Sequence, residues 1–351
     1  MTPADPTVVE LHGRQRCHYR LTNPADQPLG RIAEFLQPIL LDPQAYRLER
    51  GARLVSGNLV GVARNRRIVE ETLHHKEIEL RLRRSLRLRS LLPAQERLAG
   101  AVCSLVDSRQ WCGSYYHWFL DGLPRLIAAE DHSRRSGEIT RVIVPATLNT
   151  WQRQSLALLG LPAEQMISHR PVRRGGLAVE RLIAYVAHRW QRLGGAPFDA
   201  ASPWAVRWLA DRLSQATPPP RLTPPRRLYL SRRGVTTRQV ANEEAVLALL
   251  EPHGFVAVQS ERLSLIDQIA LFRGASHIVA PHGASLTNLL HSHSARVLEL
   301  FQEDHGVRPD FFQLAMIHGL DYRHAVCPVA APGGAVTVAL DQVAAFLEQT
   351  L

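Results

Sequence analysis

The stretch from residue 276 to residue 301 constrains the fold most, because its pattern is that of one complete strand, turn, helix, strand unit. A short apolar run at 278–280 is typical of a buried strand, Pro281-His282-Gly283 breaks it, and a segment that can form a helix follows at 284–291. A second apolar run, at 296–301, completes the unit. Such units predict a parallel sheet with right-handed crossovers, whose ligands bind at the turn after the strand.

The composition of this turn suits a phosphate group. Gly283 and Ala284 keep side-chain bulk away from the first helical turn, so backbone N–H groups and the positive end of the helix can approach an anion. His282 would lie beside that anion, and Thr287 and Asn288 about one turn further into the helix. A second interpretation is that the small residues only let the helix pack closely on the strand. The turn alone leaves both interpretations open.

Further polar residues are expected at the same edge of the sheet. The strand at 228–231 ends in Ser231-Arg232-Arg233, and the loop after it carries Arg238, Asn242 and Glu243. Arginine at a strand end can clamp a diphosphate bidentately without a metal ion. Glu299 lies near the end of the strand after the 282 turn, a usual position for an acid that holds a ribose hydroxyl.

A third pattern, at 111–126, places a histidine and a carboxylate on one helix face. His117, Asp121 and Arg125 are spaced by four residues and would form a nearly straight column. Pro124 prevents a regular helical ladder, so the helix is expected to kink or restart there. A carboxylate holds a histidine in one tautomer, as a general base requires. The pair also fits a buried hydrogen bond that fixes the helix to its domain, and the residues alone allow both roles.

Length and composition predict two domains. A chain of 351 residues with 45% hydrophobic content is too long for one ordinary core. Five prolines within residues 214–227 indicate a stiff linker. The predicted N-terminal domain is 1–213, whose first hundred or so residues have no clear pattern, and the C-terminal domain is 228–340, closed by a helix at 341–351.

Alternating strands and helices predict the α/β class for both domains. In the second domain, strands are expected at 228–231, 255–259, 277–280, 296–300 and 322–327, with helices at 242–250, 265–272, 284–291 and 309–318. In the first, strands are expected at 141–145 and 181–187 and helices at 150–159 and 204–213. Leucine or isoleucine alternates with charge at 77–89, which predicts a half-buried strand or hairpin whose arginines face solvent or grip an anionic acceptor.

The charge of the chain favours anionic small molecules over nucleic acid. The formal net charge is +10, but Lys76 is the only lysine, so the excess is almost entirely arginine. Aromatic content is 6% and no nucleic-acid-binding motif occurs, so no nucleic-acid partner is expected. The excess suits anionic substrates or peripheral contact with an anionic membrane. No apolar run approaches the roughly eighteen residues of a membrane span, and the first residues have no secretory pattern. We therefore expect a cytoplasmic protein, at most peripheral at the inner membrane face.

Neither the cysteines nor the carboxylates form a metal-binding pattern. Cys17, Cys103, Cys112 and Cys327 contain no CxxC pair, so free and mostly buried thiols are expected. The chain contains no Asp-x-Asp, the usual carboxylate pair for a magnesium- or manganese-bridged diphosphate. The expected site therefore contains no metal and no cofactor.

Three segments together resemble glycosyltransferase family 61. They are YYHWFLDGLPRL at 115–126, YLSRRGVTTRQVANEE at 229–244, and the segment from 263 to 301 that contains the HGASLTN sequence. The resemblance covers roughly residues 100–335, and the order and spacing of the three segments make it more specific than any one alone. It implies a GT-B arrangement of two facing Rossmann-like domains with doubly wound parallel sheets. The C-terminal domain would hold a nucleotide-sugar and the N-terminal domain the acceptor.

The resemblance also implies site residues and a reaction. The HGAxxTN signature falls on His282, Gly283, Ala284, Thr287 and Asn288, the strand-end arginine on Arg232, the downstream arginine and Asn-Glu pair on Arg238, Asn242 and Glu243, and the HWxxD signature on His117, Trp118 and Asp121. The implied reaction is an inverting sugar transfer without a metal, to a glycan, a lipid-linked glycan or another hydroxyl acceptor, as in bacterial surface polysaccharide biosynthesis. The alternatives are a phosphate-ester or nucleotide hydrolase and a relative that binds nucleotide or glycan without catalysis.

Overall fold

The computed structural model describes residues 6–22, 27–73, 83–106, 113–169, 172, 175–185, 190–193, 196–220, 223–235, 238–331 and 335–351. Its contacts divide the chain into two compact units. Unit 1 comprises Met1–Gln15 and Leu41–Ala205, and unit 2 comprises Arg16–Leu40 and Val206–Leu351. Each unit is built on its own sheet with parallel strands, which confirms the predicted α/β class.

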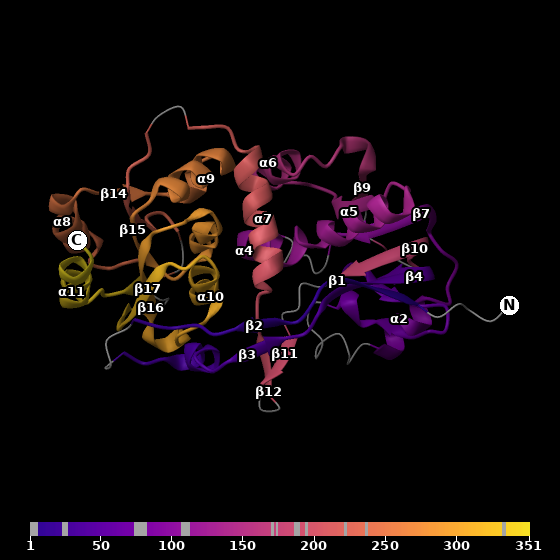
Figure 1. Cartoon of the computed structure of the whole chain (residues 1–351), viewed down its shortest axis with the longest axis horizontal. Helices are drawn as coiled ribbons and strands as arrows, with labels where there is room; N and C mark the ends of the chain where they lie inside the picture. The colour runs from indigo at the N-terminus through magenta and orange to yellow at the C-terminus, as the bar shows by residue number, and fades with distance from the viewer. Residues whose placement is uncertain are drawn as a thin grey trace. The chain divides into compact units, whose positions relative to one another are not determined.

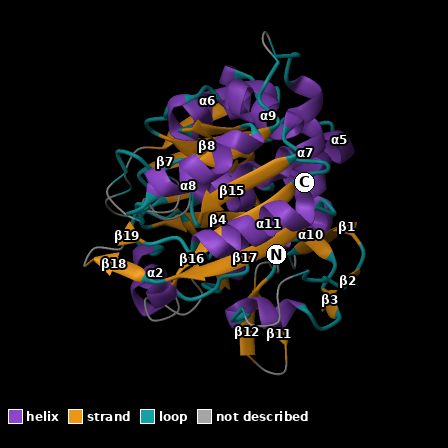
Figure 2. Cartoon of the chain, turned by 90° about the vertical axis from the view of Figure 1, so that its left-hand side faces the viewer, coloured by secondary structure: helices purple, strands orange, loops and turns teal. Residues whose placement is uncertain are grey.

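Unit 2 contains a five-stranded sheet in which every neighbouring pair is parallel. Its strands are β13 (Arg227–Leu230), β14 (Phe255–Val258), β15 (His277–Pro281), β16 (Arg296–Gln302) and β17 (Asp321–Cys327), in the spatial order β14-β13-β15-β16-β17. All five strands lie within two residues of their predicted positions, and Figure 2 shows them in orange. The central strands β13 and β15 are short, mostly apolar and almost wholly buried, as fits strands covered on both faces.

Helices cover both faces of this sheet. They are α8 (Glu243–Leu250), α9 (Leu265–Gly274), η7 (Ala284–His291), α10 (Asp310–Ile317) and α11 (Leu340–Thr350). Apolar residues of α8 and α11 share one core with Leu298 and Leu300 of β16. The ring of Phe312 on α10 meets that of Tyr322 at 5.4 Å, on the opposite face. Figure 1 shows α8 and α11 together on one side of these strands and α10 on the other. The sheet is therefore doubly wound.

The chain reverses direction across this sheet between β13 and β15. It runs from β13 outward to β14 and then returns to the other side of β13 as β15. At such a topological switch point, the two connections leave in opposite directions and open a crevice at the carboxyl ends of the strands. Arg232 follows the carboxyl end of β13, and His282 follows that of β15. Two of the predicted donor-site residues therefore lie at the switch point.

The sheet of unit 1 is mixed. Its order is β6-β5-β4-β10-β7-β8-β9, with β1 also paired to β4. The strands β7 (Glu96–Ser104), β8 (Arg141–Pro145), β9 (Met166–His169) and β10 (Leu177–Tyr185) are parallel, whereas β1 (Thr7–His12), β4 (Gln44–Val55), β5 (Val60–Val62) and β6 (Ile68–Val69) pair antiparallel. The parallel half confirms the predicted Rossmann-like character. The antiparallel half comes from the first hundred residues, which showed no clear pattern.

The helices and small sheets complete the two units. Unit 1 contains α5 (Arg125–Ser136) and α6 (Thr150–Leu158), and α7 (Pro203–Ala216) crosses the division between the units. The remaining strands are β2 (Gln15–Cys17) with β3 (Ile39–Leu41), β11 (Trp190–Leu193) with β12 (Ala196–Asp199), and β18 (Val329–Ala331) with β19 (Ala335–Val336). As in unit 2, the strand order of unit 1 reverses, here between β7 and β10.

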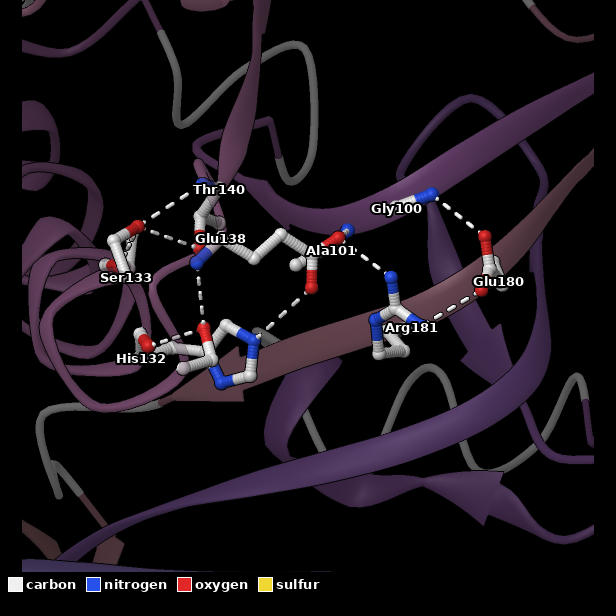
Figure 3. A network of polar contacts seen from close by, with 10 residues as sticks. Gly100, Ala101, His132, Ser133, Glu138, Thr140, Glu180 and Arg181 are labelled. Carbon is white, nitrogen blue, oxygen red and sulfur yellow. Dashed lines mark hydrogen bonds and ion pairs between the residues drawn. The ribbon is translucent and has the colours of Figure 1, made fainter.

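A bulge in β7 is held by a network of polar contacts (Figure 3). Gly100 adopts φ = 74°, a left-handed conformation that glycine tolerates. Its N–H donates to Glu180 at 2.8 Å, and the N–H of Ala101 donates to Glu138 at 2.9 Å. Arg181 donates to both carboxylates, at 2.7 and 2.6 Å. These contacts satisfy the backbone groups that the bulge removes from the ladder, so we interpret the network as structural.

The contact-based division differs from the predicted domain boundaries. Arg207 donates to the carbonyl of Ile317 at 3.0 Å, and Arg273 donates to the carbonyl of Ser214 at 2.9 Å. These bonds attach most of α7 to unit 2, so the division falls at 205/206 and not within 214–227. Residues 16–40 also join unit 2. The closing helix α11 packs on α8 within unit 2.

The predicted strand at 77–89 is wrong in its described part. Residues 77–82 lie outside the described residues, and Arg83–Arg89 form the helix α2. Leucine and arginine are good helix formers. Leu86 is 3% exposed and packs with Val55, Val60, Val62, Ile68 and Leu73, whereas Leu88 is 58% exposed. The single buried leucine, Leu86, fixes the helix, and the alternation along the sequence has no counterpart in burial.

Two further expectations concern membrane spans and thiols. Among the described residues, no helix combines the length and apolar character that crossing a bilayer requires. Cys17, Cys103 and Cys327 are buried free thiols, and Cys112 lies outside the described residues.

Replacing His291 with leucine is expected to stabilise the protein. His291 is 1% exposed, and neither ring nitrogen has a hydrogen-bond partner among the described residues. Burial lowers its pKa to about 3, and nearby His318 and Arg273 act in the same direction. The leucine variant removes this unpaired buried group, so we expect a free energy of unfolding about 1–2 kcal/mol higher in urea denaturation at pH 7.

The same substitution should change the response to acid. The unfolded chain binds a proton at this histidine below about pH 6.5 and the folded chain does not, so wild type loses about 1.4 kcal/mol per pH unit as the pH falls from 6.5 towards 3. The leucine variant lacks this group, so its free energy of unfolding should fall by about 1.4 kcal/mol less per pH unit over this range. The exposed His253 provides the control, because His253→Leu should leave the slope unchanged. Equal slopes in wild type and the His291 variant would contradict the prediction.

Candidate functional site

The turn between β15 and η7 leaves room for an arginine from the neighbouring strand. Gly283 has an extended backbone with φ = 178°, which any residue can adopt. A Cβ there would meet the end of the Arg232 side chain, so any other residue at this position would oblige the guanidinium group to move. The structure thus brings together Arg232 after β13 and Gly283 after β15, as expected for a shared carboxyl edge. Ala284 is exposed at the first position of η7.

Three arginines of unit 2 influence one another near this turn. Burial lowers the pKa of Arg232, and Arg238 lowers it further. Burial likewise lowers the pKa of Arg238, to which Arg308 adds, whereas Glu299 acts in the opposite direction. Positive charges that share a partly dry region repel each other, and an anion would relieve that repulsion. The sequence analysis did not include Arg308, which follows β16 in a third loop at the same carboxyl edge.

His282 is held in a fixed orientation by a buried carboxylate. Its Nδ1 lies 2.5 Å from Oε1 of Glu299, and the Tyr322 hydroxyl donates to Oε2 at 2.5 Å. The imidazole stacks on Phe301 at 4.9 Å and lies 5.3 Å from Phe311. A carboxylate on one ring nitrogen sets which nitrogen remains for a ligand. Here that nitrogen is Nε2.

Glu299 has different partners from the predicted ribose hydroxyl. It is 0% exposed, and its two oxygens contact His282 and Tyr322. A ribose could reach it only if one of these partners moved away. Tyr322 was missed because the contact joins β16 to β17, and pairing between strands is not visible in a local pattern.

Asn242 and Glu243 support the loop after β13. Both ends of the Asn242 side chain bond to the backbone of Val338, each at 2.9 Å. Glu243 accepts from Ser231 Oγ and from Arg233 Nε, both at 2.7 Å. In this arrangement these side chains position the strand end, and the direct contact with a ligand stays a prediction.

Thr287 and Asn288 point into packing. They are 0% and 1% exposed. The Asn288 amide donates to Gln268 of α9 at 2.9 Å and to the Ser285 carbonyl at 3.1 Å. The predicted helix over 284–291 is confirmed as a 3₁₀-helix, and the Asn288 amide lies on its face towards α9.

The second predicted group lies in unit 1, in a helix whose winding changes. The helix α4 (Tyr115–His117) continues into the π-helix η3 (Trp118–Gly122), and α5 then starts at Arg125. The N–H of Leu123 donates to the carbonyl of Trp118, five residues earlier, at 2.8 Å. Pro124 has no N–H to continue the ladder, which confirms the predicted restart. Single π turns occur often at functional sites.

The predicted histidine–carboxylate pair is present. His117 Nδ1 lies 2.7 Å from Asp121 Oδ2, with the two side chains 16% and 4% exposed. Trp118 donates to Ser155 Oγ at 2.9 Å and anchors the segment. Arg125 donates to the carbonyl of Ser104, at the end of β7, at 3.1 Å. That bond places the π-helical segment at the strand whose carboxyl end lies at the unit 1 switch point.

Neither group resembles a metal centre. Among the described residues, no three histidine, cysteine, aspartate or glutamate side chains are grouped so that they could hold a metal ion. The polar groups of these sites are arginine, histidine and paired carboxylates.

A family model matches a part of the chain that contains members of both sets of predicted site residues. The family model described as Glycosyltransferase 61 matches residues 115–298, from the α4 segment to within β16. A curated relative is the EGF domain-specific O-linked N-acetylglucosamine transferase of Drosophila melanogaster, 40% identical over 100 residues. The match covers 27% of this chain and 18% of the relative, so the chain spans less than a fifth of that protein's length.

A comparison with solved structures gives a weak likeness to one further glycosyltransferase. It is the dodecameric, iron-containing heptosyltransferase TibC in complex with ADP-D-β-D-heptose. The identity is 12%, and the likeness covers 88% of this chain and 80% of that one, with a TM-score of 0.32. A TM-score this low supports no argument about site or substrate.

Proposed function

The chain belongs to glycosyltransferase family 61, and from this premise we propose that it moves a sugar from a nucleotide-sugar to a hydroxyl of a glycan, with inversion and without a metal ion. The observation that carries the proposal is the convergence of Arg232, Arg238 and the His282 turn at the switch point of the unit 2 sheet. This is the position at which doubly wound sheets bind nucleotides.

The proposed donor site neutralises the leaving group. When the bond from the anomeric carbon to the diphosphate breaks, negative charge grows on the β-phosphate. Arg232 and Arg238 supply fixed positive charge, and the exposed start of η7 supplies backbone N–H groups. His282 Nε2 contributes a further polar contact. We assign Glu299 and Tyr322 to holding that ring in place and not to the ribose.

The proposed base is the His117–Asp121 pair. The acceptor oxygen attacks the anomeric carbon on the face opposite the diphosphate, and its proton passes to Nε2 of His117. Asp121 holds Nδ1 and stabilises the charge that the ring acquires. The limited exposure of His117, 16%, favours a selective contact with one hydroxyl.

Three finer proposals go beyond family membership: the biological setting, the acceptor and the independence from metal ions. We propose surface polysaccharide biosynthesis as the setting, with a glycan or lipid-linked glycan as acceptor. The absence of an Asp-x-Asp in the sequence supports chemistry without a divalent ion, because arginine and helix N–H groups must then meet the diphosphate charge.

A donor screen tests this function. The purified chain is incubated with nucleotide-sugars of different bases, a mixture of glycan acceptors and EDTA, and products are identified by mass spectrometry and by NMR of the anomeric proton. We expect transfer that is dependent on acceptor, resistant to EDTA and inverted at the anomeric carbon. Rapid donor hydrolysis that acceptors do not change would favour the hydrolase alternative, and loss of activity with EDTA would contradict the metal-independent mechanism.

A further inference from the structure

A cavity lined by arginines lies in unit 1, and no residue of the proposed site lines it. Its volume is about 790 Å³, comparable to that of small-molecule sites, which typically span about 300–1,000 Å³. Five arginines line it: Arg66, Arg67, Arg83, Arg84 and Arg87. They come from the turn between β5 and β6 and from α2, which is labelled in Figure 1.

The turn holds two of the arginines in a defined geometry. The N–H of Ala63 donates to the carbonyl of Arg67 at 2.8 Å, and Asn65 Oδ1 accepts from the N–H of Arg67 at 3.0 Å. Arg66 adopts φ = 64°, a conformation uncommon in residues other than glycine, asparagine and aspartate. Arg66 therefore carries a charge at a turn position where the backbone conformation disfavours an arginine.

The helix supplies the other three arginines and is fixed by burial of Leu86. Arg83 lies 3.6 Å from Glu70, and both side chains are about half exposed, at 42% and 53%. Among the residues that the structure describes, Arg84 and Arg87 form no ion pair, and neither do the two arginines of the turn. The cavity therefore carries excess positive charge, which suits phosphate groups.

Exposed leucines adjoin the charged cavity. Leu88 and Leu91 line it and are 58% and 61% exposed, and Leu92 beside them is 45% exposed. A soluble sugar phosphate would need the arginines but not this apolar rim. Arginines beside exposed leucines are the composition of surfaces that bind the interface of anionic membranes, where guanidinium groups meet phosphates and leucines enter the acyl boundary.

We propose that this surface, formed by the five arginines and Leu88, Leu91 and Leu92, docks the protein on a membrane of anionic phospholipid. Lipid phosphates occupy the arginine cavity, and the leucines insert beside them. The inference is independent of the proposed sugar transfer, because it rests on a separate cavity and on binding alone.

Vesicle sedimentation tests the charge. The full chain is mixed with vesicles of phosphatidylcholine alone or with a quarter of phosphatidylglycerol, at low and high salt. We expect binding only to the anionic vesicles, weakened by salt. Arg84→Glu combined with Arg87→Glu should weaken binding at least tenfold. Arg226→Glu with Arg296→Glu is the matched control, because it makes the same change in charge at two exposed arginines of unit 2 and should bind as wild type does.

A second pair of variants tests the leucines. Leu88→Ser with Leu91→Ser retains every arginine and alters only exposed side chains, so folding should be unchanged by circular dichroism while vesicle binding falls several-fold. Inorganic pyrophosphate added as a soluble competitor should displace little protein. The proposal is overturned if the protein ignores anionic vesicles, if both charge-reversal pairs bind alike, if the serine variant binds as wild type does, or if pyrophosphate binds in place of vesicles. Transfer measured without vesicles reports separately on the proposed function.

Discussion

Replacing His117 with alanine is expected to reduce kcat for sugar transfer by about 10²–10⁴-fold, the usual contribution of a general base. Affinity for the nucleotide-sugar should remain within about twofold of wild type, because the proposed donor contacts belong to unit 2. Asp121→Asn should give a comparable loss, because an amide that donates to Nδ1 holds the ring in the tautomer that cannot accept a proton at Nε2 and does not stabilise the charged ring. Initial rates at saturating donor, together with calorimetric titration of the donor, separate these effects.

The control for this prediction is a second histidine beside a carboxylate in the same unit. His132 Nε2 lies 3.8 Å from Glu138 and is similarly buried. His132→Ala should leave kcat unchanged even if stability falls. If both alanine variants lose activity in parallel with their melting temperatures, the His117 pair is a structural bond. Full activity in His117→Ala would remove it from the mechanism.

Replacing Arg232 with alanine is expected to remove most of the affinity for the donor. Hydrogen bonds to charged groups contribute about 1.5–3 kcal/mol, so the dissociation constant for the nucleoside diphosphate should rise roughly 10- to 100-fold. Arg232→Lys should recover only part of it, because lysine retains the charge but lacks the two-pronged donor geometry. Calorimetric titration with the diphosphate product measures this without requiring turnover.

Two further substitutions define the site around Arg232. Gly283→Ala retains every charge but displaces the end of the Arg232 side chain, so it should weaken diphosphate binding by less than Arg232→Ala does. The neighbouring Arg233 is 55% exposed and pairs with Glu243, so Arg233→Ala is the matched control and should have little effect. Equal losses in Arg232→Ala and Arg233→Ala would mean that general positive charge, and not the geometry of the turn, holds the diphosphate.

The sequence was most informative where function and local pattern coincide. The 276–301 pattern places β15, η7 and β16 to within about two residues, because buried strands and a Pro-Gly break are local signals. The spacing of His117 and Asp121 likewise predicts their contact, because residues four apart lie on the same face of a helix. Arg232 and Gly283 could be expected to meet because parallel strands end at a common edge.

The sequence was least informative where a side chain finds its partner on another element. Asn242, Glu243 and Asn288 have polar groups of the kind that bind ligands, yet Val338, Ser231 and Gln268 already occupy them. Nothing in a single sequence distinguishes a polar group reserved for substrate from one used to hold a loop. The same reason explains two further differences from the prediction. Contacts with residues distant in the sequence place residues 16–40 in unit 2, and they also stabilise a helix at Arg83–Arg89.

The three residues His282, Glu299 and Tyr322 lie on or directly after three neighbouring strands, β15, β16 and β17. A ribosome therefore makes the histidine and its carboxylate well before the tyrosine that steadies them. A nascent or truncated chain that ends ahead of β17 lacks the tyrosine, and its imidazole has an incomplete support. Competence to hold a donor should consequently arise late in synthesis, after the scaffold that surrounds it.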